Sequence, residues 1–260
     1  MFLWINLREI APMDLFMRKH LYFLSYLLIL NPFILFANEP ISLKKLEENN
    51  NIFIIKGTQK PYTGIVNEFY KNKKIKYTGN FENGKKTGEW KYFEETGTMW
   101  LSETYKDGKK FGEYIRFHIN GVPWKKGRYL NNKKNGEWDF FSIDGKKLEE
   151  GNYLEDQKNG IWKKYHDNGK LWEKVTYKIN IKHGPAQFFY QDGTLGNDEN
   201  WNNGLKDGIW KMYYPNGKLR KQGFFKDDKK NGIWKTYSSN EVLYMMEVWD
   251  NGLLLKTENP

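Results

Sequence analysis

The sequence contains no cysteine. Disulfide bonds, thiolate metal sites, cysteine nucleophiles and a lipid-modified cysteine are therefore excluded. Histidine is nearly as scarce, with four residues in 260, and none of them stands at a metal-ligand spacing. Neighbouring carboxylates such as Glu94-Glu95 would point to opposite sides of a strand. The sequence thus predicts a protein that is not an enzyme, with no catalytic residues, no metal and no cofactor.

Long apolar runs are also lacking, except near the amino terminus. Met17 to His20 is basic, Leu21 to Phe36 is apolar, and the small residue Ala37 precedes the polar Asn38. This order is typical of a secretory signal peptide. We therefore expect residues 17–37 to form a signal helix that is cleaved between Ala37 and Asn38.

Two further readings concern the same end of the chain. Residues 1–16 resemble an upstream extension, so we expect translation to start at Met17. The apolar run also approaches the length of a membrane span, so an uncleaved membrane anchor is the alternative to cleavage. Asn31-Pro32 interrupts the run and favours cleavage.

Glycine, by contrast, recurs every 24 residues without insertion or deletion. Each glycine is followed five residues later by one aromatic and seventeen residues later by another. A fixed period of this length indicates one small structural unit that is stacked on copies of itself. The eight glycines are Gly64, Gly88, Gly112, Gly136, Gly160, Gly184, Gly208 and Gly232.

Each repeat reads as a β-hairpin. In the repeat from Gly160 to His183, residues 161–165 predict a first strand, Asn168-Gly169 a tight turn with positive φ at both residues, and residues 171–177 a returning strand. A lone hairpin is marginal in water, so the units must pair edge to edge. We predict an all-β fold, an elongated open antiparallel sheet of eight stacked hairpins over residues 64–255.

The regions flanking the repeats differ from them. Residues 38–63 predict a polar lead-in, partly helical at Ser42–Glu48, followed by a capping strand within residues 51–57, and residues 256–260 form a short tail. Repeat six replaces the usual Gly-x-Trp with Gly184-Pro185-Ala186, which predicts a gap and a bend or weak point there.

One spacing leaves two alternatives open. The aromatics at the third and sixth repeat positions, such as Trp162 and Tyr165, are separated by an odd number of residues. Either a bulge lies between them, or both faces of the sheet carry aromatics.

The unit G-x-W-x-x-[YF]-x-x-[ND]-G-K-L resembles the bacterial variant of the MORN repeat. The best copies are GIWKKYHDNGKL (160–171) and GIWKMYYPNGKL (208–219). The resemblance implies an open sheet of hairpins that contacts proteins or lipids and has no chemistry of its own. Many bacterial relatives are labelled antitoxin components of toxin–antitoxin systems, so an antitoxin-like protein that neutralises a partner by binding is one implied function.

The chain is basic, with a formal net charge of +10. Many lysines stand in pairs between repeats, such as Lys85-Lys86, Lys109-Lys110 and Lys133-Lys134. These pairs indicate solvated turns that keep a β protein soluble. The alternative is attraction to an anionic membrane or glycan surface.

Binding residues are best sought where the repeat does not require an aromatic. Trp100, Trp124 and Trp172 occupy the thirteenth position, where other repeats accept lysine, glycine or arginine. We therefore predict that these three tryptophans are partly exposed and contribute to a contact surface for a partner.

The leading interpretation is an exported, non-enzymatic repeat protein that presents its sheet to a protein partner at the cell envelope, in the periplasm or on the cell surface. The alternatives are a binder of anionic lipid or glycan through lysine-rich turns, and the antitoxin-like protein. Nucleic acid is not an expected partner. Two open sheet edges would also allow two copies to pair as a homodimer.

Overall fold

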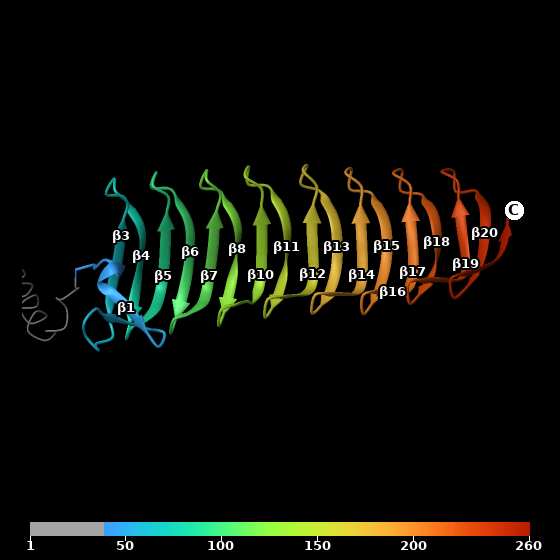
Figure 1. The fold of residues 1–260 in the computed structure, drawn as a ribbon. Coiled ribbons are helices and arrows are strands. Elements are labelled where there is room, and N and C mark those ends of the chain that lie inside the picture. The colour runs from blue at the N-terminus through green and yellow to red at the C-terminus, as the bar shows by residue number, and fades with distance from the viewer. Residues whose placement is uncertain (1–38) are drawn as a thin grey trace, which may run out of the picture. The chain divides into compact units, whose positions relative to one another are not determined.

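The structure, a computed structural model, describes residues 39–260. The predicted signal peptide, its cleavage site between Ala37 and Asn38, and the extension 1–16 lie outside the described residues. Within residues 39–260, nineteen strands form one antiparallel sheet and two more form a separate hairpin. Figure 1 shows the strands of the sheet side by side in chain order, from β3 at one end to β21 beside the carboxyl terminus. The predicted all-β fold, a long sheet of stacked hairpins, is confirmed.

The short elements at the amino-terminal end are a 3₁₀ helix η2 (Leu43–Lys45) and strands β1 (Leu46–Asn49) and β2 (Ile52–Ile55). The sheet then comprises β3 (Gly64–Phe69), β4 (Ile75–Glu82), β5 (Lys85–Phe93), β6 (Met99–Lys106), β7 (Lys109–Phe117), β8 (Pro123–Leu130), β9 (Lys133–Lys134), β10 (Gly136–Phe141), β11 (Lys147–Leu154), β12 (Gln157–Tyr165), β13 (Leu171–Lys178), β14 (Ile181–Phe189), β15 (Leu195–Asn202), β16 (Leu205–Lys206), β17 (Gly208–Tyr213), β18 (Leu219–Lys226), β19 (Lys229–Tyr237), β20 (Leu243–Asp250) and β21 (Leu253–Glu258).

Every repeat supplies two long strands, and each long strand pairs with the next. The two-residue strands β9 and β16 directly precede β10 and β17 and continue into them, because β8 pairs with both β9 and β10, and β15 with both β16 and β17. The last strand, β21, pairs with β20. At the opposite end, Ile41 forms a parallel bridge with Val66 of β3.

The turns inside the hairpins form one rim of the sheet, and they differ from the turn predicted at Asn-Gly. In repeat five, the Gly169 N–H donates to His166 O at 2.8 Å, and only Gly169 of the Asn168-Gly169 pair has positive φ. This is a β-turn followed by a left-handed glycine, the common three-residue form. Asn168 uses its side chain instead: Oδ1 accepts from Lys170 N at 3.0 Å, and Nδ2 donates to Gln191 O of the next hairpin at 2.7 Å.

The tight two-residue turns lie between the repeats, on the other rim. Their two central residues both have positive φ, as in Asn131-Asn132 (51° and 69°) and Asp107-Gly108 (51° and 78°). The Asn132 N–H donates to Lys110 O at 3.0 Å, and its Oδ1 accepts from Lys110 N at 2.7 Å. Bonds of this kind join each turn to the previous one, so both rims fix the spacing of 24 residues.

The repeat glycine lies inside a strand in five repeats and is the first residue of β3, β10 and β17 in the other three. Gly160 is in the interior of β12 with φ +84°, where the pairing with β11 shifts register between Gly151 and Tyr153. A left-handed residue at a β-bulge is a position that glycine fills without steric cost. The strict recurrence of this glycine therefore marks the bulge between consecutive hairpins.

The core is a row of large side chains that each lie on the backbone of the preceding hairpin. Trp162 is 1 % exposed and covers Gly151 so closely that an added Cβ there would lie 2.3 Å from Trp162 Cδ2. The same close approach joins Gly79 to Trp90, Gly127 to Trp138 and Gly223 to Trp234. A small residue on one strand is thus matched to a large one on the next.

In repeat six the larger residue is on the preceding strand and the smaller one follows. No gap is left, so the predicted gap at Ala186 was wrong. Val175 lies opposite Ala186, and the two are 1 % and 0 % exposed. The valine fills the volume that tryptophan fills elsewhere. Pro185 needs no ladder bond to β13, because it lies in the register shift between Val175 and Tyr177.

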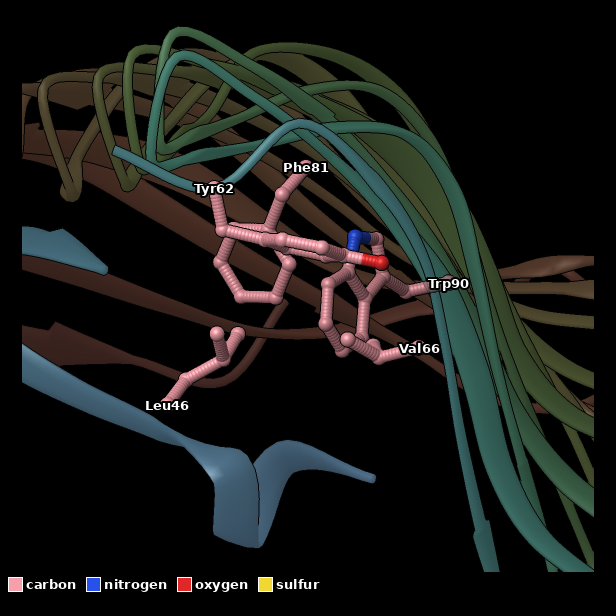
Figure 2. Packing of buried hydrophobic residues seen from close by; sticks show 5 residues of the cluster. All are labelled: Leu46, Tyr62, Val66, Phe81 and Trp90. Carbon is pink, nitrogen blue, oxygen red and sulfur yellow. The ribbon is translucent and has the colours of Figure 1, made fainter. Parts of the chain in front are cut away.

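The lead-in covers the first repeat. The expected capping strand is β2, which pairs with β1 and does not extend the main sheet. Phe53 N donates to Gly84 O at 2.8 Å, and Leu46 packs with Tyr62, Val66, Phe81 and Trp90 (Figure 2). The helix predicted at Ser42–Glu48 is limited to Leu43–Lys45, which Ser42 caps, because β1 begins at Leu46.

The glycine–tryptophan contact gives a stability prediction. Gly151→Ala should destabilise the protein by about 1–3 kcal/mol, because its Cβ would overlap the Trp162 ring. Urea denaturation followed by tryptophan fluorescence would measure the loss. Gly196→Ala is the milder comparison and should cost less, since its Cβ would lie 3.3 Å from the Phe188 backbone oxygen, a tight contact without the overlap met at Gly151.

A double variant tests the compensation directly. Gly151→Val with Trp162→Ala copies the Val175–Ala186 pair and should be more stable than Gly151→Val alone. Equal stability of the single and the double variant would show that the match of volumes does not matter.

Candidate binding surface

The sheet has two chemically different faces. The inner face carries the residues at repeat positions 3 and 18, counted from the glycine as position 1, and the strands arch over it in Figure 2. Tyr165, at position 6, lies on the outer face, where its hydroxyl donates to Glu150 Oε1 at 2.7 Å. Both faces therefore carry aromatics.

A bulge is also present, but it falls on the returning strand. Lys164 pairs with Glu173 and Tyr165 with Leu171, so Trp172 is the extra residue. Trp100 and Trp124 are the extra residues of their own hairpins. The three predicted binding tryptophans thus share one bulged position, where the sheet ladder makes no fixed demand on the side chain.

A row of lysines covers the inner aromatics. At position 23 of the first seven repeats, the ammonium group lies over the rings at positions 3 and 18 of neighbouring hairpins. Lys158 Nζ is 3.8 Å from the centroid of the Trp162 ring, and Lys134 Nζ is 4.4 Å from that of Tyr153. Such contacts are attractive and gain strength when they are desolvated. This lysine row comprises Lys86, Lys110, Lys134, Lys158, Lys182, Lys206 and Lys230.

The lysine row was not predicted from the sequence, because each Lys-Lys pair was interpreted as part of a solvated turn. Only the first lysine of a pair, such as Lys85 or Lys109, is exposed. The second is partly buried, and burial lowers the pKa of Lys86. The available signal was recurrence, since position 23 is lysine in each of the first seven repeats, whereas position 22 also accepts glutamine, isoleucine and leucine.

Carboxylates on the inner face neutralise part of this charge. Glu103, 4 % exposed, pairs with Lys110 at 2.7 Å, and Glu149 pairs with Lys158 at 2.6 Å. The Tyr105 hydroxyl donates to Glu103 at 2.7 Å, and burial followed by this bond raises the pKa of Tyr105.

Two of the predicted tryptophans lie together around one arginine. The Arg116 guanidinium on β7 is 4.9 Å from the ring centroid of Trp124 and 5.8 Å from that of Trp100. Trp124 is 38 % exposed, whereas Trp100 packs partly against Leu101 and Tyr114. The structure therefore brings Trp100 and Trp124 into one cationic and aromatic patch.

Trp172 lies apart from that patch, on β13. It is 45 % exposed and contacts Lys164 (5.6 Å) and His166 (6.0 Å). Lys164 is in turn paired with Glu173 at 3.2 Å. Trp172 thus stands at the same repeat position as Trp124, but the charge of the lysine beside it is neutralised by Glu173.

The histidines on the strand ends have structural bonds. Nε2 of His118 lies 3.0 Å from Phe141 O, and Nε2 of His166 lies 2.9 Å from Phe189 O. Tyr70 and Tyr190, at the same repeat position, donate to the equivalent carbonyl of the next repeat at 2.7 Å. Within residues 39–260, no three His, Asp or Glu side chains gather as a metal site would require.

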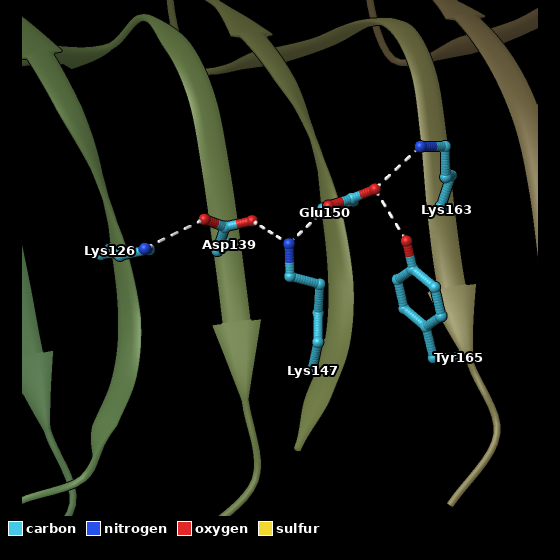
Figure 3. Close-up of polar contacts among 6 residues, drawn as sticks. All are labelled: Lys126, Asp139, Lys147, Glu150, Lys163 and Tyr165. Atoms are coloured by element: carbon cyan, nitrogen blue, oxygen red, sulfur yellow. Dashed lines mark hydrogen bonds and ion pairs between the residues drawn. The ribbon is translucent and has the colours of Figure 1, made fainter. Parts of the chain in front are cut away.

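The outer face carries a charge network across β8, β10, β11 and β12. Lys147 Nζ lies 3.0 Å from Asp139 and 2.6 Å from Glu150, and Glu150 also accepts from Lys163 at 2.9 Å (Figure 3). Hydrogen bonds, that from Lys147 first, lower the pKa of Glu150 to about 2. Burial, then the bond to Glu150, raises the pKa of Tyr165 to about 12. The network ties three successive hairpins together.

In the part of the chain that the structure describes, no helix has the length and apolarity needed to span a bilayer.

The repeat geometry accords with the family comparison. Four of the eight repeats match the MORN repeat variant. The matched segments are residues 62–83, 86–107, 158–178 and 206–227, which contain repeats one, two, five and seven. No curated protein matches the chain. The chain thus carries MORN-type repeats in an elongated antiparallel sheet, an architecture that fits a protein used for interactions.

The Glu150 network predicts a defined pH dependence. The folded pKa of Glu150 is depressed, so its contribution is complete above the pKa of the unfolded state, about 4.3, and is lost as the pH falls toward about 2. Glu150→Gln should lower stability by about 1 kcal/mol at pH 6, after allowance for solvent screening, and by almost nothing near pH 2.

Urea midpoints of both proteins at the two pH values would measure this. Glu155→Gln is the matched control, because Glu155 pairs with Lys133 at 2.9 Å but is 65 % exposed. A stability difference for Glu150→Gln that does not change with pH would contradict the network's role.

Proposed function

We propose that the chain is an exported, non-enzymatic interaction protein that presents its sheet to a protein partner at the cell envelope, in the periplasm or on the cell surface. The basic segment 17–20 and the apolar run 21–36 support export. The described residues offer a long rigid surface, which is the usual basis of recognition by repeat proteins.

The exposure of the tryptophans supports the proposal most directly. Trp90, Trp138, Trp162 and Trp234 of the inner face are each 1 % exposed, whereas Trp124 and Trp172 are 38 % and 45 % exposed. Partly exposed tryptophans contribute strongly to protein–protein contacts. Their bulged position requires no aromatic for folding, so a binding role explains their presence better than packing does.

Replacement of all three tryptophans, Trp100, Trp124 and Trp172, by serine tests this role. Capture of partners from the envelope fraction by the purified chain should weaken by about ten-fold or more, while the β circular-dichroism signal stays unchanged. Loss of that signal would place the three residues in the core and remove the argument.

Export has its own measurement. Expression of the full reading frame in its native host, followed by fractionation and mass determination of the amino terminus, should give a chain that begins at Asn38 outside the cytoplasm. An intact amino terminus in the membrane fraction would favour a tethered form of the same function. A cytosolic chain would favour the antitoxin-like alternative.

A second candidate function is binding to an anionic lipid or glycan surface. The observation that favours it is the exposure of the first lysine in each turn pair, Lys85, Lys109, Lys133 and Lys229. These ammonium groups lie along one rim of the sheet and could meet a flat charged surface. Salt-sensitive binding to acidic vesicles would identify this function.

A further inference from the structure

The charge on the inner face is uneven along the sheet. Around β7 to β9, four cations, Arg116, Lys110, Lys125 and Lys134, accompany the single carboxylate Glu103. Around β11 to β14, three cations, Lys158, Lys164 and Lys182, accompany two carboxylates, Glu149 and Glu173, which pair with Lys158 and Lys164. In residues 39–260, Lys110 is the only one of the first four cations with an ion-pair partner.

Cross-strand pairing places two of these cations directly opposite each other. Arg116 and Lys125 are direct partners on adjacent strands. Two like charges placed opposite each other destabilise a sheet. The equivalent pair in repeat five is Lys164 and Glu173, with opposite charges. The protein therefore tolerates a repulsive pair at a position where an attractive pair is available to the same fold.

The surroundings strengthen the positive field. Lys125 Nζ lies 4.8 Å from the Trp124 ring centroid and 5.9 Å from that of Tyr114. Partial burial, followed by the charges of Lys134, Arg116 and Lys110, lowers the pKa of Lys125. Charges above low-dielectric rings are screened less than charges in open water.

We propose that Arg116, Lys125 and Lys134, with the rings of Trp100 and Trp124, bind an acidic, partly apolar peptide segment of a partner protein. The inference rests on the proposed function and names the chemistry of its partner. Five residues from three successive hairpins form this surface, which we call the acidic-segment site.

The geometry favours a peptide over other anions. The rings of Trp100 and Trp124 occupy the neighbourhood of the Arg116 guanidinium, and its N–H edge suits the planar, two-oxygen geometry of a carboxylate. The site lies on the inner face of arched strands, which a flat bilayer cannot follow but an extended segment can (Figure 2). The exposed indole ring of Trp124 then offers contact to apolar side chains between the carboxylates.

The test uses a short fluorescein-labelled peptide in which glutamate alternates with leucine and serine, and fluorescence anisotropy at about 0.1 M salt. The full chain should bind it, and Arg116→Gln with Lys125→Gln should weaken binding about ten-fold or more. Removal of a like-charge pair should not lower the urea midpoint, so the variant should fold. Trp124→Ser should also weaken binding.

Two matched controls define specificity. Lys85→Gln with Lys109→Gln removes the same charge from exposed turns and should change affinity less than about two-fold. Tyr244→Ser removes the aromatic at the same repeat position in repeat eight, which is 45 % exposed and lies outside the site, and should leave affinity unchanged. A peptide with lysine in place of glutamate should not bind.

Several outcomes would overturn the inference. One is that the acidic peptide does not bind. Another is an equal loss of affinity in both double variants, which would indicate unspecific charge attraction. If binding to phosphatidylglycerol vesicles or to a single-stranded oligonucleotide depends equally on Arg116 and Lys125, the site belongs to another anion. Tryptophan-dependent partner capture without binding of the acidic peptide would leave the proposed function standing and remove only this inference.

Discussion

The close contact between a tryptophan and the glycine of the preceding hairpin is the interaction on which the sheet depends. Trp162 can lie flat only because Gly151 has no side chain, and the ammonium of Lys158 then covers the exposed side of the ring. The glycine comes from β11, and the indole and the lysine come from β12 of the next hairpin. Because each ring bridges two repeats, no hairpin has a complete core by itself. The units must stack, as in other repeat proteins.

This dependence explains what could be predicted from the sequence. The recurrence of glycine and aromatics at fixed intervals was sufficient to predict hairpins and their stacking, because one geometry repeated eight times leaves little freedom. The returning strand of repeat five, predicted at residues 171–177, is Leu171–Lys178. The position of the turn glycine was predicted, but the tight turn with two positive φ angles was assigned to the wrong rim, since Asn-Gly suits both turn forms.

The features that were missed are those that need neighbouring strands to be seen. The sequence alone does not distinguish a lysine that is solvated beside a turn, such as Lys85, from one that lies over an aromatic ring, such as Lys86. The filling of the space above Ala186 by Val175 likewise depends on which residues become partners. For the proposed binding surface, the sequence led to Trp100, Trp124 and Trp172, whose binding role stays a prediction. Arg116, which lies beside the first two, had no signal of its own because position 5 is acidic, basic, aromatic or aliphatic in different repeats.

A stack of equivalent repeats could bind a partner anywhere along its length, so specificity must come from the differences between repeats. The positions that hold the fold together, 3 and 18, vary little in chemistry, while positions 5, 13 and 14 on the same face vary freely between acidic, basic, aromatic and small residues. The freely varying positions converge near one rim, where a bulge separates them from the aromatic core. Four of the five residues of the proposed acidic-segment site stand at these varying positions, and the fifth, Lys134, belongs to the lysine row. A change of charge from Glu173 to Lys125 at one repeat position can therefore alter what the sheet binds without altering how it stacks.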